Sequence, residues 1–208
     1  MPASPPRKLG FKNKPALEKA KLVALFALIA ALVWLSRPTP LLFGWGALAT
    51  LVGAGIRIWA AGHLTRDQRL AVSGPYAHTR NPFYLGRLLV LLGFALMSGL
   101  QNTLVWLLLV GALGFFFFGY MPRKERREGG RLQQLFGEQF KAYRQNVPSL
   151  FPRPSSYRDP FTTEKRAWSR ELFFGGDGRF SGNKELPTAL STLLLLGLFL
   201  ARLLTLHT

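Results

Sequence analysis

A run of polar and aromatic residues, SGPYAHTRNPFYLG at positions 73–86, stands between two long apolar stretches of the chain. Its side chains suit a charged ligand. The faces of Tyr76 and Tyr84 can attract a cation, and Arg80 or the free N–H groups at a helix start can receive an anion. The amide of Asn81 adds a hydrogen-bond donor and an acceptor, but it cannot act as a general base near neutral pH. The segment therefore predicts either a site for a charged ligand or the start of a helix at a water interface.

The second of these explanations is purely structural. Asn81 is a residue type favoured at helix N-caps and Pro82 a type favoured at the first helical position, so the pair can simply start a helix. Tyr76 and Tyr84 can be ordinary aromatic residues of a membrane interface. Taken alone, the segment leaves both explanations open.

A second polar segment, 122–152, carries carboxylates, many cations and an amphipathic pattern. Glu125 and Glu128 lie about one helical turn apart, and their carboxylates can accept hydrogen bonds from amino and hydroxyl groups. Gly129-Gly130 predicts a locally unwound backbone beside them, because each glycine costs a helix about 1 kcal/mol relative to alanine. Apolar side chains share one helical face, which is typical of an interfacial helix: Leu132, Leu135, Phe136, Phe140 and Tyr143.

Five apolar blocks surround these two segments and must position them. Each approaches the length that crosses about 30 Å of hydrocarbon, which predicts an all-α polytopic membrane protein with about five transmembrane helices. Arg57, Arg87 and Arg202 fall near block ends, where long side chains can reach the interface. The blocks cover about 17–35, 41–64, 83–100, 103–121 and 188–206.

The formal net charge of +17 follows the expected membrane topology. Basic residues precede the first block and follow the second and fourth, while the alternate loops hold only Arg37. Because basic loops stay in the cytoplasm, we expect the amino terminus there and the carboxyl terminus on the opposite side. The same cations predict contact with anionic lipid headgroups, and no nucleic acid is expected. The absence of cysteine excludes disulfides and thiolate metal sites, and no metal is expected.

The chain divides by composition into four parts. Residues 1–15 are expected to form a disordered basic tail, 16–152 a four-span membrane core, 153–186 a polar linker rich in turn-forming residues, and 187–208 a fifth transmembrane helix. The alternative for the linker is an amphipathic patch that dips into the interface, with Trp168, Phe173 and Phe174 as its apolar residues.

In sequence order, the two polar segments resemble the integral-membrane isoprenylcysteine carboxyl methyltransferase and phospholipid methyltransferase superfamily. The pattern L-x-x-x-G-P-Y-x-x-x-R-N-P-x-Y-x-G begins at Leu70, and E-x-x-x-L-x-x-x-F-G-x-x-F-x-x-Y-x-x-x-V-P begins at Glu128, one span later. The resemblance covers roughly 53–152, about half of the chain. It implies a pocket for S-adenosylmethionine on the cytoplasmic side of the membrane helices and methylation of groups carried by lipids.

The resemblance assigns cofactor contacts to matching positions, and Arg80 joins them as a candidate partner of the cofactor carboxylate. Many members of the superfamily have histidine where this chain has Asn81, so proton transfer by that side chain is not expected. Lys124 stands where an arginine would be expected to steer an anionic substrate. Lys124 and Arg127 are therefore predicted to contact substrate, with Arg123 close by. The implied contacts are Leu70, Ala71, Tyr76, Asn81, Pro82, Phe83, Tyr84 and Glu128.

The predicted function is S-adenosylmethionine-dependent methyl transfer to a membrane-embedded lipid or prenylated acceptor. Catalytic residues are not assigned, since alignment and desolvation can supply most of the rate. One alternative is a nicotinamide-dependent reductase of the membrane sterol type, which shares a related R-x-P-x-Y segment. Another is a non-enzymatic membrane scaffold.

Overall fold

The computed structural model describes residues 23, 27, 29–64, 69–162, 167–174 and 185–207. Every regular element within these ranges is a helix, which confirms the all-α prediction. The first predicted span is described only at positions 23, 27 and 29–35, and all of these except Leu35 are helical. The predicted basic tail, 1–15, lies outside the described residues.

Within the described residues, three helical stretches are long and apolar enough to cross a membrane: α2, the stretch Thr103–Asn146 that comprises α4, η2 and α5, and α7. The apolar helix α3 is shorter, at 17 residues. A π-helical stretch, η2, joins α4 to α5, and a single 3-10 turn, η1, precedes α3. The elements are α2 (Pro40–Ala61), η1 (Gly74–Ala77), α3 (Pro82–Ser98), α4 (Thr103–Gly114), η2 (Phe115–Tyr120), α5 (Met121–Asn146), α6 (Arg170–Phe174) and α7 (Glu185–His207).

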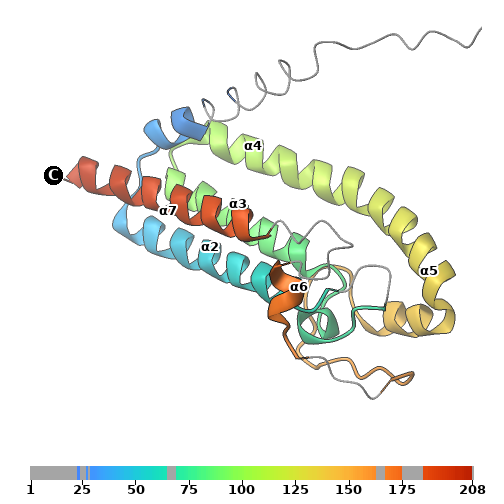
Figure 1. The fold of residues 1–208 in the computed structure, drawn as a ribbon. Coiled ribbons are helices and arrows are strands. Elements are labelled where there is room, and N and C mark those ends of the chain that lie inside the picture. The colour runs from blue at the N-terminus through green and yellow to red at the C-terminus, as the bar shows by residue number, and fades with distance from the viewer. Residues whose placement is uncertain are drawn as a thin grey trace, which may run out of the picture.

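Helices α2 and α3 pack at unusually short range because glycines face each other. A Cβ on Gly86 would lie 2.5 Å from the carbonyl oxygen of Gly53, and one on Gly93 would lie 2.5 Å from that of Gly46. Small residues allow this close approach in membranes, where van der Waals packing drives helix association. Helix α7 lies beside both helices, whereas α4 runs away from them towards α5 (Figure 1).

The helix in the second polar segment is interrupted at a different residue from the one predicted. Helix α5 continues through Gly129 and Gly130, so the unwinding predicted there is wrong. The backbone instead leaves the helical region at Gly137, with φ 48° and ψ −124°. Glycine is the residue that tolerates this positive φ, and the chain bends there so that the second half of α5 returns towards η1 (Figure 1). The face that carries Phe140 and Tyr143 is thereby buried.

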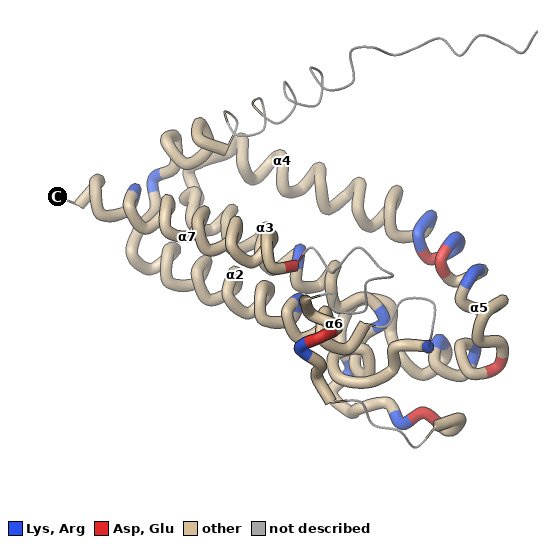
Figure 2. Tube along the Cα trace, in the orientation of Figure 1, with Lys and Arg blue, Asp and Glu red and all other residues tan. Residues whose placement is uncertain are grey.

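The two ends of the helices differ in charge. Figure 2 shows that charged residues gather mainly at the end that holds α5 and α6, while the middles of α2, α3, α4 and α7 carry few. The carboxyl terminus lies at the opposite end (Figure 1). At that end the N–H of Arg37, before α2, donates to the carbonyl of Ser98, the last residue of α3, over 3.1 Å. Both polar segments therefore lie at one end of the helices.

The segment predicted to be a linker makes specific contacts. Tyr157 packs with Phe140, Tyr143 and Val147 in a buried cluster. Further along, the indole N–H of Trp168 donates to the carbonyl of Ile58 over 3.1 Å. The backbone N–H of Ser169 donates to the carbonyl of Gly62 over 2.9 Å, and Phe173 of α6 is buried. These contacts fasten the described parts of 153–174 to the charged end of α2 and to η1.

Candidate functional site

A cavity of about 500 Å³ opens at the charged end of the helices. The carboxyl end of α2, the first turns of α3, the segment 69–81, both parts of α5 and the start of α7 form its walls. The structure brings together all nine residues predicted to contact the cofactor, and also Lys124. The cavity lining includes Leu70, Ala71, Tyr76, Arg80, Asn81, Pro82, Phe83, Tyr84, Lys124 and Glu128.

Arg127 is the one predicted site residue that does not line this cavity. It is exposed, because the period of about 3.6 residues puts Lys124, Glu128 and Leu132 on one face of α5 and Arg127 beside that face. Its role as a substrate contact stays a prediction that the geometry of this cavity does not support.

Three hydrogen bonds from distant parts of the chain hold the wall that contains Tyr76. The hydroxyl of Tyr143 donates to the carbonyl of Tyr76 over 2.8 Å. The backbone N–H of Arg80 donates to the carbonyl of Pro148 over 2.9 Å, and the backbone N–H of Tyr157 donates to the carbonyl of Ala77 over 2.9 Å. These bonds tie the irregular segment to α5 and to the chain that follows it.

His63 supports the same wall from behind. Gly74 has φ 60°, and a Cβ there would lie 2.5 Å from the ring of His63. The Nδ1 atom of His63 is 3.1 Å from the hydroxyl oxygen of Ser73. Burial lowers the pKa of His63, since a low-dielectric environment disfavours the charged imidazolium. The segment is thus packed against a histidine that is neutral at neutral pH.

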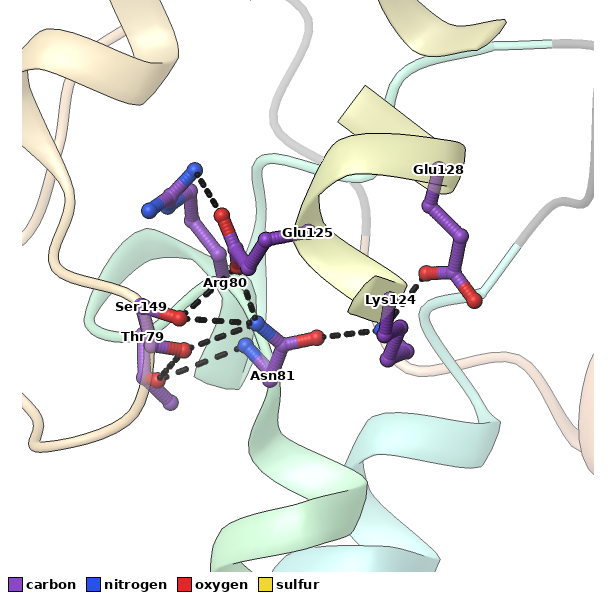
Figure 3. A network of polar contacts seen from close by, with 7 residues as sticks. All are labelled: Thr79, Arg80, Asn81, Lys124, Glu125, Glu128 and Ser149. Atoms are coloured by element: carbon purple, nitrogen blue, oxygen red, sulfur yellow. Dashed lines mark hydrogen bonds and ion pairs between the residues drawn. The ribbon is translucent and has the colours of Figure 1, made fainter. Parts of the chain in front are cut away.

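Asn81 occupies the N-cap position of α3, but its side chain does not cap the helix. The amide instead joins the two polar segments (Figure 3). Its Nδ2 donates to Glu125 Oε1 over 3.1 Å and to the carbonyl of Ser149 over 2.9 Å. Its Oδ1 accepts from Lys124 Nζ over 2.7 Å. Pro82 alone starts the helix, so the structural explanation accounts for the proline and not for the asparagine side chain.

Glu125, which was not among the predicted contacts, is the better-connected carboxylate. It accepts from Ser149 Oγ over 2.7 Å and from Asn81, and it pairs with Arg80 Nη1 at 3.1 Å. Glu128 lies on the far side of Lys124 and pairs with it (Figure 3). The side chain of Glu125 is 22% exposed and that of Glu128 57% exposed. Glu125 therefore organises the site, while Glu128 faces the opening.

The ring of Tyr84 lies in a cationic and aromatic environment. Lys124 Nζ lies 4.7 Å from its centroid, and the guanidinium carbon of Arg87 lies 5.7 Å from it. The hydroxyl groups of Tyr84 and Tyr120 are 2.6 Å apart, which links α3 to the π-helical stretch. The ring thus offers the cavity a face that already attracts positive charge.

Several lining residues carry no local signal in the sequence. Arg57 on α2 pairs with Glu185 on α7, 128 positions away, and both line the cavity. Arg57 was expected to reach the interface, but it is buried, so that prediction is wrong. The remaining lining residues that were not among the predicted contacts are Leu64, Arg69, Arg87, Glu125, Gly129, Arg131, Leu132, Phe136, Phe140 and Tyr143.

The donor set suits a ligand that carries an anionic group together with amino or hydroxyl groups. Arg80 Nε is buried, and within the described residues it has no hydrogen-bond partner, so it can serve an incoming carboxylate. Glu125 and Glu128 supply acceptors, and Phe136 and Phe140 supply apolar wall. A volume of about 500 Å³ falls within the range of about 300–1,000 Å³ that is usual for small-molecule sites.

Two comparisons with known proteins find related sequences. Residues 40–138 match the family model described as phospholipid methyltransferase. Over 149 residues the chain is 32% identical to the cobalt-zinc-cadmium resistance protein CzcN of Cupriavidus metallidurans; the match covers 68% of this chain and 66% of that protein. No solved structure matches the chain. The matched region holds α2, α3, α4, η2 and most of α5, and through it the chain belongs to the phospholipid methyltransferase family.

Proposed function

We propose that this protein transfers a methyl group from S-adenosylmethionine to an acceptor held in the membrane. The observation that carries the proposal is the junction of the two polar segments. Asn81 from one segment and Lys124 and Glu125 from the other bind each other directly at the wall of one cavity. This junction lies at the end of apolar helices and within the region that matches the family.

The residues present fit the chemistry of the proposed methyl donor. Arg80 can bind its carboxylate through the buried Nε, and the glutamates can accept hydrogen bonds from its amino and ribose hydroxyl groups. The face of Tyr84 can attract its positive sulfur. When bound, S-adenosylmethionine supplies a methyl group on a sulfonium, which is already a good electrophile. The chain then needs chiefly to align the acceptor and exclude water.

Asn81 has a positioning role in this proposal rather than a role in proton transfer. A side-chain amide does not titrate near neutral pH, so it cannot serve as a general acid or base there. The amide instead fixes Lys124 and Glu125 relative to the first turn of α3. The distance between the walls of the cavity is thereby set by hydrogen bonds.

A smaller cavity of about 210 Å³ supports a membrane acceptor. It lies between α3 and the α4–η2 rod, and it shares Tyr84 and Arg87 with the main cavity. Its other lining residues are almost all apolar, among them Leu91, Leu113 and Phe116. An acceptor with an apolar chain can thus lie between the helices with its head at Tyr84. We propose that this end of the helices faces the cytoplasm, because it carries most of the cations.

Isothermal titration calorimetry on the detergent-purified chain tests the proposal. S-adenosylmethionine and NADPH are titrated separately into the wild type, Tyr84→Ala and the control Glu138→Ala. Glu138 is exposed and lies outside the cavity. We expect the wild type and the control to bind S-adenosylmethionine equally and Tyr84→Ala to bind it at least about tenfold more weakly, a loss of about 1.4 kcal/mol. A wild type that binds NADPH in preference, or neither compound, refutes the proposal.

A further inference from the structure

Arg57 places a guanidinium in the wall of the cavity at the level of the first turn of α3. It is 7% exposed, and its guanidinium carbon lies 6.0 Å from the centroid of Phe83. Its alkyl chain crosses α3 at Gly86, where a Cβ would lie 2.6 Å from Arg57 Cγ. The side chain is therefore held in one place by α3 and cannot extend to the interface.

Glu185, the first residue of α7, neutralises this guanidinium. Arg57 Nη2 donates to Glu185 Oε2 over 2.7 Å and to Oε1 over 3.0 Å, and Arg57 Nε donates to Oε2 over 3.0 Å. The side chain of Glu185 is 15% exposed, and it too lines the cavity. Helix α7 lies outside residues 40–138, so the family match itself does not include this residue.

The charges of the cavity give this pair a consequence for ligand binding. Six lysine or arginine residues and three glutamates line the cavity. The bound form of the proposed methyl donor carries a sulfonium charge that must enter this cationic surrounding. A buried guanidinium without its carboxylate would repel that charge, and the repulsion is strong where water is scarce.

We propose that Glu185 is a positioning residue that lets the cavity accept a sulfonium, by neutralising Arg57. This inference rests on the function proposed above. It assigns a binding role to a helix outside the matched region, and it makes a prediction about charge that a purely structural link between α2 and α7 does not make. A structural link would affect charged and uncharged ligands alike.

The experiment compares S-adenosylmethionine with S-adenosylhomocysteine, which lacks the methyl group and the positive charge. Calorimetry on the full chain in detergent gives both dissociation constants for the wild type, Glu185→Gln, Arg57→Gln and the double variant. In Glu185→Gln we expect affinity for S-adenosylmethionine to fall about tenfold relative to affinity for S-adenosylhomocysteine. This magnitude is that of the repulsion between two unit positive charges, the Arg57 guanidinium and the sulfonium, taken as about 10 Å apart at an effective dielectric constant of about 20.

The other variants complete the test. Arg57→Gln leaves the carboxylate without its partner, so we expect it to shift the preference towards S-adenosylmethionine, and we expect the double variant to restore the wild-type ratio. Glu138→Gln is the matched control with an unchanged ratio. Equal losses of both ligands in Glu185→Gln, or an unchanged ratio in Arg57→Gln, overturn the inference. A wild type that binds neither ligand refutes the proposed function itself.

Discussion

Replacing Glu125 or Glu128 by alanine provides a sensitive internal comparison of two carboxylates on one helix. Both positions lie in α5, one turn apart, so the gain in helix propensity is the same and cancels. Glu125→Ala removes the acceptor of Arg80, Asn81 and Ser149. Glu128→Ala removes an ion pair whose carboxylate is 57% exposed.

The magnitudes follow from burial and from the number of partners. Hydrogen bonds to a charged group contribute about 1.5–3 kcal/mol each, but three bonds to one carboxylate do not add. We therefore expect Glu125→Ala to lower the free energy of unfolding by about 3 kcal/mol. An exposed pair contributes less than about 1 kcal/mol. The difference of about 2 kcal/mol corresponds to about 4–8 °C in a chain of this size.

The assay is thermal unfolding in one detergent at one scan rate, followed by circular dichroism. We expect the apparent midpoint of Glu125→Ala to lie several degrees below that of Glu128→Ala, which should stay near the wild type. Equal midpoints, or a larger loss in Glu128→Ala, would show that Glu125 does not organise the site and would refute the reasoning from its contacts.

Two further predictions concern the parts of the fold that support the cavity. Burial lowers the pKa of His63, so as pH falls below about 6.5 the unfolded chain binds a proton at this imidazole before the folded chain does. The thermal unfolding midpoint of the wild type should therefore decrease from pH 7 to pH 5, and that of His63→Gln should decrease less. An equal fall in both proteins contradicts this. Gly86→Ala forces a Cβ to within 2.5 Å of the carbonyl of Gly53, so we expect a loss of about 1–3 kcal/mol in thermal unfolding. Gly55→Ala, where a Cβ meets nothing within 4 Å, is the control and should lose no stability, and similar losses in both would contradict the packing argument.

Features set by neighbouring residues could be predicted from the sequence. Apolar block lengths gave the long helices, and Pro82 gave the start of α3 within a residue. The family pattern predicted that Tyr76, Asn81 and Tyr84 share one pocket, and all three line the cavity. Each of these signals lies within one or two helical turns, where spacing determines which residues share a face.

Features set by contacts between distant residues could not be predicted in this way. Glu125 and Glu128 are both glutamates and lie about one turn apart on the same helix, so the sequence does not distinguish them. The contacts that Ser149 and Arg80 make with Glu125 are what make it the organising carboxylate. The pair of Arg57 and Glu185 joins helices 128 positions apart. The sequence offered no signal for it, because each residue reads as a charge at a helix end.

The bend in α5 shows a third limit. Helix propensity predicted unwinding at Gly129-Gly130, yet the backbone departs from the helix at Gly137. A propensity cost of about 1 kcal/mol per glycine is small enough for tertiary packing to override. Burial of Phe140 and Tyr143 against Ala77 and Tyr157 instead determines where the chain turns.

Hydrogen exchange with and without S-adenosylmethionine tests most directly whether the two polar segments share one ligand cavity. The geometry predicts that amides of 70–84 and 121–136 gain protection together. Amides of 99–105, at the opposite end of the helices, should not change. Protection confined to one segment, or protection at 99–105 instead, would contradict the account.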